Sequence, residues 1–175
     1  LIGEAMLDSE LEPIFLVVPR HAERRAAVAA DLKSIGYEVV LKSERHKPNR
    51  PSKACLVADT TGELRDWTAH ADVVIIGKSW LGEGGQNPAE AITAGVPVVC
   101  GPHMGNFEPL ISMLRESGGV RMLESADQLA AEVDSLLSNP AITAQITTSA
   151  KEVLSSHENA VEKTIDLVYL KASVR

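Results

Sequence analysis

The chain contains a glycine-rich loop that leads directly into the start of a helix. The loop covers residues 82–86, the helix start is Asn87-Pro88-Ala89-Glu90, and apolar β-branched runs lie on both sides at residues 73–76 and 96–100. The first turn of a helix presents backbone N–H groups that no helical carbonyl accepts, and such groups bind anions. A carboxylate such as that of Glu90 accepts hydrogen bonds from both hydroxyls of a ribose. These residue types indicate a site for a nucleotide.

Helix capping explains the same residues without any ligand. With Asn87 as the N-cap, Pro88 as the first helical residue and Glu90 as the third, the segment would form a capping box. Residues 60–63 and 125–128 have the same form. Glycines accompany the first two segments and permit close approach of a ligand to the backbone, whereas none accompanies the third. From these residues alone both interpretations stay open.

Strands and helices alternate along most of the chain. Apolar runs predict strands at residues 14–18, 38–41, 54–58, 73–76, 96–100 and 120–123, with helices between them at 23–35, 62–69, 88–94 and 108–117. This order predicts an α/β fold, a Rossmann-like three-layer α/β/α sandwich with a mostly parallel sheet of about six strands. Three amphipathic helices at residues 127–137, 142–155 and 160–170 follow and cap the domain, and the last presents an apolar stripe that needs a neighbour.

Polar clusters follow four of the predicted strands. They are residues 19–21, 59–63, 77–79 with the glycine-rich loop, and 101–103. In an open parallel sheet ligands bind at the carboxyl ends of the strands, so we expect these clusters to face one rim. Arg20 there would offer a planar fork of donors to a phosphate or carboxylate, or else pair with Glu23 or Glu63.

Composition excludes several classes of function. A net charge of -7 over 175 residues argues against nucleic acid as the main partner. Cys55 and Cys100 fall in predicted buried strands, so we expect free thiols in a reducing compartment. The sequence has no apolar run of about 18 residues and no signal peptide, which predicts a soluble domain.

Several catalytic and binding motifs are missing from the sequence. It contains no G-x-S-x-G nucleophile elbow of a hydrolase, no histidine spacing typical of metal ligands, no G-x-G-x-x-G fingerprint and no P-loop. The basic segment at residues 44–53 is read as a solvated loop, or as a contact for an anionic membrane surface.

Four motifs, in this order, resemble those of the 3-deoxy-D-manno-octulosonic acid (Kdo) transferases of lipopolysaccharide synthesis, which have a GT-B glycosyltransferase fold. The resemblance spans most of the chain. The motifs are Pro19-Arg20-His21 with Glu23-Arg24, Asp59-Thr60-Thr61-Gly62-Glu63-Leu64, Gly84-Gly85-Gln86-Asn87-Pro88-Ala89-Glu90, and Ala94-Gly95-Val96-Pro97-Val98 leading to Gly101-Pro102-His103 and Asn106-Phe107.

The resemblance implies that residues 1–175 are the C-terminal, donor-binding half of a two-domain GT-B enzyme. By position, the residues implied to contact the donor CMP-Kdo are Arg20, His21, Thr61, Gly62, Glu63, Asn87, Pro88, Ala89 and Glu90. The family's general base is a glutamate of the N-terminal domain, so we expect no catalytic residue and no independent activity here. The whole enzyme is implied to transfer Kdo to a lipid A precursor at the cytoplasmic face of the bacterial inner membrane, with no cofactor or metal.

The chain departs from the family pattern at residues 78–81, at Gln86 and at Met104, which leaves details of the sugar and acceptor open. Trp80 is either a residue lining an interdomain cleft or an ordinary buried tryptophan. Two other functions stay open. One is another GT-B transferase or a UDP-sugar epimerase. The other is a flavodoxin-like signalling or interaction module, although only Asp59 among the expected acidic residues stands at a strand end.

Overall fold

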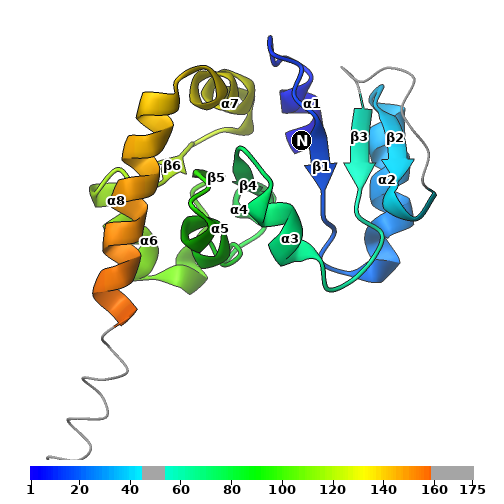
Figure 1. Cartoon of the computed structure of the whole chain (residues 1–175). Coiled ribbons are helices and arrows are strands. Elements are labelled where there is room, and N and C mark those ends of the chain that lie inside the picture. The colour runs from blue at the N-terminus through cyan, green and yellow to red at the C-terminus, as the bar shows by residue number, and fades with distance from the viewer. Residues whose placement is uncertain (45–53, 159–175) are drawn as a thin grey trace, which may run out of the picture. The chain divides into compact units, whose positions relative to one another are not determined.

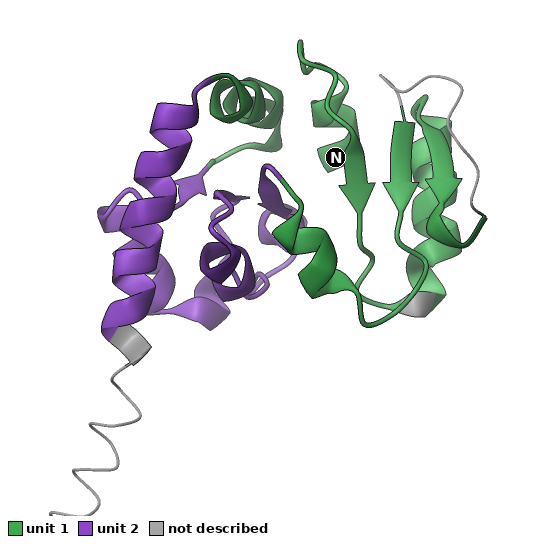
Figure 2. Cartoon of the chain, in the orientation of Figure 1, with its two compact units in different colours: residues 1–71, 123–138 green, residues 72–122, 139–175 purple. Residues whose placement is uncertain are grey.

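The structure is a computed structural model that describes residues 1–44 and 54–158 of the chain. Most of the basic segment at 44–53 and the whole helix predicted at 160–170 therefore lie outside the described residues. The chain divides into two compact units (Figure 2). Unit 1 contains residues 1–71 and 123–138, and unit 2 contains residues 72–122 and 139–175.

Unit 1 is built on a parallel three-stranded sheet (Figure 1). Its strands are β1 (Phe15–Val17), β2 (Glu38–Leu41) and β3 (Ala54–Val57), in the order β1-β3-β2. Cys55 of the central strand lies opposite Phe15 of β1 and Val39 of β2. Because β3 pairs on both edges, its side chains are the most buried of the three strands, and Cys55 and Val57 are fully enclosed.

Three helical segments follow the strands of this sheet. The 3-10 turn η1 (Ala22–Arg24) continues into α2 (Arg25–Ser34), a second turn η2 (Lys42–Glu44) follows β2, and α3 (Leu64–Ala69) follows β3. The α2 helix packs on the sheet, where Leu32 joins Tyr37, Cys55 and Val57 in one apolar cluster. Burial of this cluster, with Val28 and Ile35 beside it, fixes the start of α2 near the end of β3.

The N-terminal helix α1 (Ile2–Met6) packs on α7 (Leu129–Ser138) and on the turn η5 (Ala126–Gln128). The Ser9 hydroxyl donates to Asp134 over 2.5 Å, and the Glu10 amide donates to the same carboxylate over 2.7 Å. The capping box predicted at Ser125 and Gln128 forms in full at the start of η5. This contact fastens residues 123–138 to unit 1 although they are distant in sequence.

Unit 2 contains a second parallel sheet of three strands. They are β4 (Val74–Ile76), β5 (Val98–Cys100) and β6 (Arg121–Met122), in the order β4-β5-β6. Its helical elements are α4 (Lys78–Leu81), α5 (Ala89–Ala94), η4 (Gly105–Phe107), α6 (Leu110–Glu116) and α8 (Pro140–Glu158). The long α8 helix packs against α5 and α6.

The predicted α/β class is confirmed, and each of the six predicted strands is present with parallel pairing. Their hydrogen bonds form two sheets of three strands each. The prediction missed α4, because four residues are too few to show helical periodicity. Among the described residues, none of the helices has the length and apolar character that a membrane span requires.

The thiols of Cys55 and Cys100 are free and fully buried, as predicted. Burial raises the pKa of each thiol to about 12. The reactive thiolate is therefore almost absent at neutral pH, and the folded chain should resist alkylation by iodoacetamide. Mass spectrometry of the chain with and without guanidinium chloride measures this, and labelling should appear only with the denaturant. Rapid labelling of either residue in the folded chain would contradict the buried placement.

Candidate functional site

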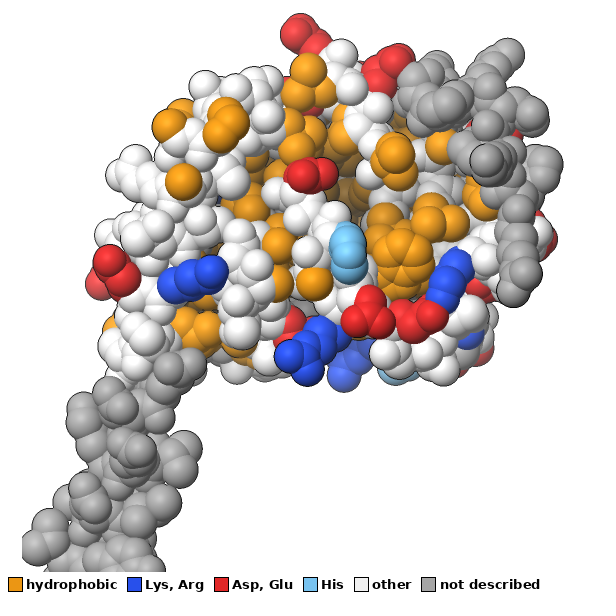
Figure 3. Space-filling view, viewed as in Figure 1, with side chains coloured by type: hydrophobic (Ala, Val, Ile, Leu, Met, Phe, Trp, Pro, Cys, Tyr) orange, Lys and Arg blue, Asp and Glu red, His pale blue; other side chains and the backbone are white. Residues whose placement is uncertain are grey.

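The carboxyl ends of β1, β2 and β3 lie at one edge of the unit 1 sheet, since all three strands run in parallel. The Ala58 amide donates to the Val17 carbonyl over 2.9 Å, which keeps the chain after β3 beside the end of β1. Figure 3 shows acidic and basic side chains close together on the surface where these strands end. This edge carries the segments that follow all three strands.

The loop after β3 is held by a side chain of α2. The Arg25 guanidinium donates through Nη1 to the Asp59 carbonyl and through Nη2 to the Thr60 carbonyl, the latter over 3.0 Å. The planar fork of arginine suits two neighbouring carbonyls. Arg25 is the first residue of α2, so the helix that covers the sheet also fixes the loop.

Glu63 is held by two donors from different strand ends. Lys42 Nζ donates to its Oε1, Thr60 Oγ1 donates to its Oε2, and Lys42 Nζ also donates to Thr60 Oγ1 over 3.3 Å. The Lys42 bond, followed by the Thr60 bond, holds the pKa of Glu63 below its ordinary value. The Lys42 ammonium lies 5.7 Å from the centre of the Trp67 ring on α3.

This arrangement corrects the capping box predicted at residues 60–63. Thr60 bonds to the Glu63 carboxylate itself, and α3 begins only at Leu64 with no side-chain cap. The reason is Lys42, whose charge draws the carboxylate away from the helix backbone. Lys42 is not among the residues predicted from the sequence, although it directly follows the strand at 38–41, a position that could have marked it.

Asp59 is fixed by the other residue that follows β2. The Ser43 amide donates to Asp59 Oδ1 over 3.0 Å, and the Ser43 hydroxyl donates to Oδ2. The Ser43 hydroxyl is the main reason that the pKa of Asp59 lies below its ordinary value. Asp59 therefore links the segment after β3 to the segment after β2.

Arg20 and His21 follow β1 and are exposed. Among the described residues Arg20 forms no hydrogen bond or ion pair, so the predicted pairing with Glu23 or Glu63 is absent. Glu23 instead lies 3.8 Å from Nδ1 of His21, and Glu63 is bound to Lys42. The guanidinium of Arg20 is therefore available to a ligand.

Thr61 and Gly62 are the exposed part of the loop after β3. Gly62 has a φ of +85°, and nothing lies within 4 Å of the position that a Cβ atom would occupy. Its backbone can therefore be approached closely, as the sequence predicted.

Asn87, Pro88, Ala89 and Glu90 start α5 in unit 2. The N-cap of α5 is Pro88 and has no side-chain cap bond, which corrects the prediction of Asn87 as the N-cap and Pro88 as the first helical residue. Asn87 Oδ1 still accepts the Ala89 amide over 2.9 Å, so that N–H group is already satisfied. Glu90 is exposed, and the reciprocal bond to the Asn87 backbone is absent from the described residues. Pro88 is fully buried and anchors the turn.

The glycines of the loop before α5 are used for packing within unit 2. Gly84 has a φ of +88°, and a Cβ atom there would lie 2.3 Å from Nδ2 of Asn106. Gly85 has a φ of +65°, and a Cβ atom there would lie 2.3 Å from the sulfur of Met104, which is itself buried. The departure at Met104 is therefore a packing feature.

Ser79 and Trp80 of α4 join the ends of β4 and β5. The Ser79 hydroxyl donates to the Ile76 carbonyl over 2.5 Å and accepts the Gly101 amide over 2.6 Å. Trp80 is only 9% exposed, and its ring lies against Gly101. Trp80 is thus a core residue, which answers the open question about a cleft-lining role.

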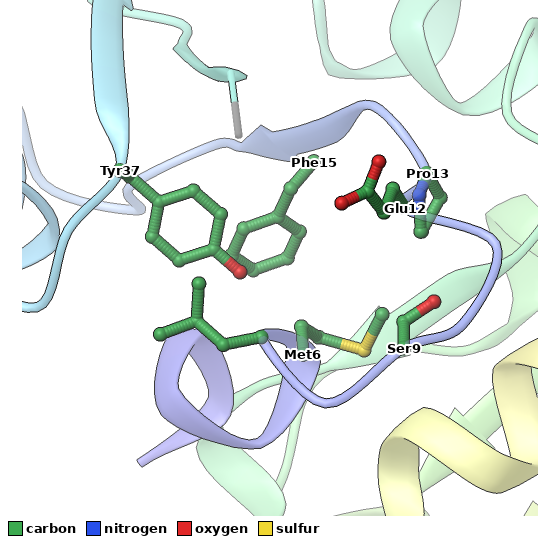
Figure 4. A pocket seen from close by; sticks show the side chains of 7 residues that line it. Met6, Ser9, Glu12, Pro13, Phe15 and Tyr37 are labelled. Atoms are coloured by element: carbon green, nitrogen blue, oxygen red, sulfur yellow. The ribbon is translucent and has the colours of Figure 1, made fainter. Parts of the chain in front are cut away.

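Each unit contains a small pocket among its described residues. In unit 1, Met6, Phe15 and Tyr37 line a cavity of about 30 Å³ at the amino end of β1 (Figure 4), opposite the candidate site. In unit 2, Met104, Ile111 and Arg115 line one of about 120 Å³. Neither cavity has the several hundred Å³ that a nucleotide-sized ligand fills, and none of the proposed contact residues lines either of them. The described residues contain no cluster of His, Cys, Asp and Glu that could hold a metal ion.

Comparison with known proteins connects the chain to one family. The chain is 33% identical over 164 residues to the 3-deoxy-D-manno-octulosonic acid transferase of Haemophilus influenzae, and the match covers 92% of the chain and 38% of that protein. It is 30% identical to the C-terminal CMP-Kdo binding domain of WaaA from Acinetobacter baumannii, with a TM-score of 0.79, covering 87% of this chain and 81% of that one. HepE from Anabaena, solved with UDP, shares the fold alone, at 13% identity with a TM-score of 0.67 over 98% of this chain and 44% of that one. No family model matches the chain.

The fold and the likeness to WaaA define the class of the protein as one domain of a GT-B glycosyltransferase. The chain belongs to the 3-deoxy-D-manno-octulosonic acid transferase family, as its four motifs predicted. The chain matches only 38% of the length of the Haemophilus enzyme, and the part of WaaA that it resembles is the C-terminal domain. This result sets aside the signalling module and the epimerase.

Gly85→Ala should destabilise unit 2 by about 2 to 4 kcal/mol, since it combines a strained φ with a collision at Met104. Gly62→Ala is the matched control, with the same kind of φ but open space, and should cost about 1 to 2 kcal/mol. Urea unfolding of both variants measures the difference. Equal losses at the two positions would show that Gly85 has no packing role.

Ser79→Ala should lower the free energy of unfolding by about 1 to 3 kcal/mol, because the buried Gly101 amide would lose its acceptor. Ser34→Ala is a suitable control, since that hydroxyl is exposed and only donates to the Asp31 carbonyl. Its effect should stay within about 0.5 kcal/mol. Thermal unfolding followed by circular dichroism compares the two. A Ser79 variant as stable as the Ser34 variant would refute the proposed link between β4 and β5.

Proposed function

We propose that this domain binds the nucleotide part of CMP-Kdo, as the donor half of an enzyme that transfers Kdo to a lipid A precursor. The observation that carries the proposal is the likeness to the CMP-Kdo binding domain of WaaA, which extends over most of both chains. On this proposal, residues 1–175 are the C-terminal domain of a two-domain protein.

The carboxyl edge of the unit 1 sheet supports the proposal chemically. Glu63, in the loop after β3, is held as an ionised acceptor. Arg20 follows β1, the neighbouring strand, and offers an unpaired guanidinium. Arginine binds phosphate and carboxylate groups with two parallel hydrogen bonds, and the donor contains both groups. Thr61 and Gly62 are exposed, so the ligand can approach the backbone between these charges.

His21 and residues 87–90 complete the proposed set of contacts. His21 stands next to Arg20 and is exposed, so it can reach the same ligand group. Asn87 and Glu90 expose polar side chains at the start of α5, while Pro88 and Ala89 shape the turn that carries them. In unit 2 the proposal therefore relies on side chains more than on free backbone amides.

We assign no catalytic step to this chain alone. Transfer of Kdo requires a base that activates the acceptor hydroxyl, and on this proposal a glutamate of the N-terminal domain supplies it. The residues here would orient the donor and stabilise the negative charge on the departing CMP. The isolated domain is then expected to bind nucleotide without turnover, and the whole enzyme would act at the cytoplasmic face of the inner membrane.

Titration of the labelled domain with CMP, followed by NMR, tests the proposal. Amide shifts should concentrate at residues 20–21, 61–63 and 87–90, and UMP should compete less well than CMP. Glu63→Gln should weaken CMP binding about tenfold, because hydrogen bonds to a charged acceptor are lost. Asp31→Asn, an equal charge change at an exposed position on α2, should bind normally.

The absence of shifts in all three segments at millimolar CMP would overturn the proposed function. Shifts confined to another surface would overturn the residue assignment while leaving nucleotide binding intact.

A further inference from the structure

We propose that Lys42 is a positioning residue of the donor site, which fixes Glu63 as a hydrogen-bond acceptor and so favours a nucleoside that presents an N–H or O–H donor there. This inference rests on the proposed nucleotide binding. It adds a residue that the sequence motifs did not include.

Lys42 reaches Glu63 because β2 and β3 are neighbours in the sheet. Leu41 at the end of β2 lies opposite Val57 at the end of β3, so the segments that follow both strands begin side by side. Lys42 Nζ then bonds to one oxygen of Glu63, and Thr60 bonds to the other. Each carboxylate oxygen is thus held by a donor from a different strand end.

A second contact restricts where the lysine can go. Its ammonium lies 5.7 Å from the centre of the half-buried Trp67 ring, a distance at which the ring attracts a cation. Lysine otherwise has a flexible four-carbon stem. The tryptophan of α3 and the hydroxyl of Thr60 therefore help to keep the charge next to Glu63.

The pair is still accessible to a ligand. The Lys42 and Glu63 side chains are 30% and 35% exposed. An ionised carboxylate has about four acceptor positions and no donor, and Lys42 and Thr60 use two of them. The free positions accept hydrogen bonds only.

This chemistry discriminates between nucleosides. Cytosine presents an exocyclic amine and ribose presents hydroxyls, which all donate to a carboxylate. At the same ring position uracil presents a carbonyl, whose oxygen would repel the charge of Glu63, and its own N–H donor lies at the neighbouring ring nitrogen. A contact to the exocyclic amine therefore favours cytosine, whereas a contact to the ribose hydroxyls does not distinguish the two bases. Glu63 could accept from the cytosine amine or from a ribose hydroxyl. Both are hydrogen-bond donors, and nucleotide analogues that lack one or the other show which of them Glu63 accepts.

The experiment measures the affinities of the full chain and its variants for CMP, 2′-deoxy-CMP and UMP by calorimetry. The variants are Lys42→Met, Lys42→Arg and Glu63→Gln. Lys33→Met is the matched control, because Lys33 is exposed in the last turn of α2. NMR titration of the Glu63 carboxyl without nucleotide provides a readout that does not depend on binding.

Lys42→Met should weaken CMP binding roughly fivefold, the upper range for a partly exposed ion pair, while Lys42→Arg and Lys33→Met bind as the original chain does. The original chain should discriminate against whichever analogue lacks the donor that Glu63 accepts. That discrimination should shrink in Lys42→Met and in Glu63→Gln. The Glu63 pKa should rise in Lys42→Met but not in Lys33→Met.

Unchanged CMP affinity and unchanged discrimination in Lys42→Met would overturn this inference and leave the proposed function standing. Failure of the original chain to bind CMP would overturn the proposed function, and the ligand role of Lys42 with it. Should Lys42→Met fail to fold, Glu63→Gln still decides, since full discrimination in that variant refutes the acceptor role.

Discussion

Parallel pairing of β3 with both β1 and β2 is the constraint on which the candidate site depends. A central strand with neighbours on both sides brings three strand ends to one edge, and each end here continues into polar residues. Arg20 and Lys42 therefore flank the loop after β3 from opposite sides, and Lys42 meets Glu63 although they are 21 positions apart in the sequence. If β1 or β2 ran antiparallel to β3, the polar residues that follow that strand would lie at the opposite edge of the sheet and could not contact the loop after β3.

Side-chain hydrogen bonds give the loop after β3 a defined conformation. Arg25 binds two consecutive carbonyls, Ser43 binds Asp59, and Lys42 binds Glu63. The Ser43 hydroxyl lowers the pKa of Asp59, and the hydrogen bonds from Lys42 and Thr60 lower the pKa of Glu63, so both carboxylates are stabilised in the ionised form. The net charge of the whole chain, -7, has little bearing on this edge, because its local charges pair within a few ångströms. The exposed Arg20 is then the group with unused charge, which suits the anionic part of a nucleotide.

The sequence predicted the strands well because apolar β-branched runs bounded by turn residues are a local signal. The strand expected at 38–41 matches β2 residue for residue, and the others differ only at their ends. The four motifs predicted the family, and Asn87 accepts an amide at the start of α5 as expected, although the N-cap is Pro88. Contacts between strand ends were beyond this reasoning. Arg25 and Lys42 bind partners that are distant in sequence, and only the order of strands in the sheet decides which ends become neighbours. The capping box predicted at residues 60–63 was wrong for the same reason, because Lys42, which follows β2, binds the Glu63 carboxylate.

The positive-φ glycines divide into two kinds, and the division changes the meaning of the glycine-rich loop. Gly84 and Gly85 face Asn106 and Met104, so their missing side chains are already filled by neighbours within unit 2. Gly62 has the same backbone conformation but faces open space. Neighbouring side chains require a glycine at positions 84 and 85, whereas the positive φ at Gly62 is accompanied by open space, as it is at Gly36 and Gly118. The glycine-rich loop that indicated a nucleotide site is thus a packing element that supports the turn at Asn87, and on the proposed function the exposed backbone of Thr61 and Gly62 is open to the nucleotide.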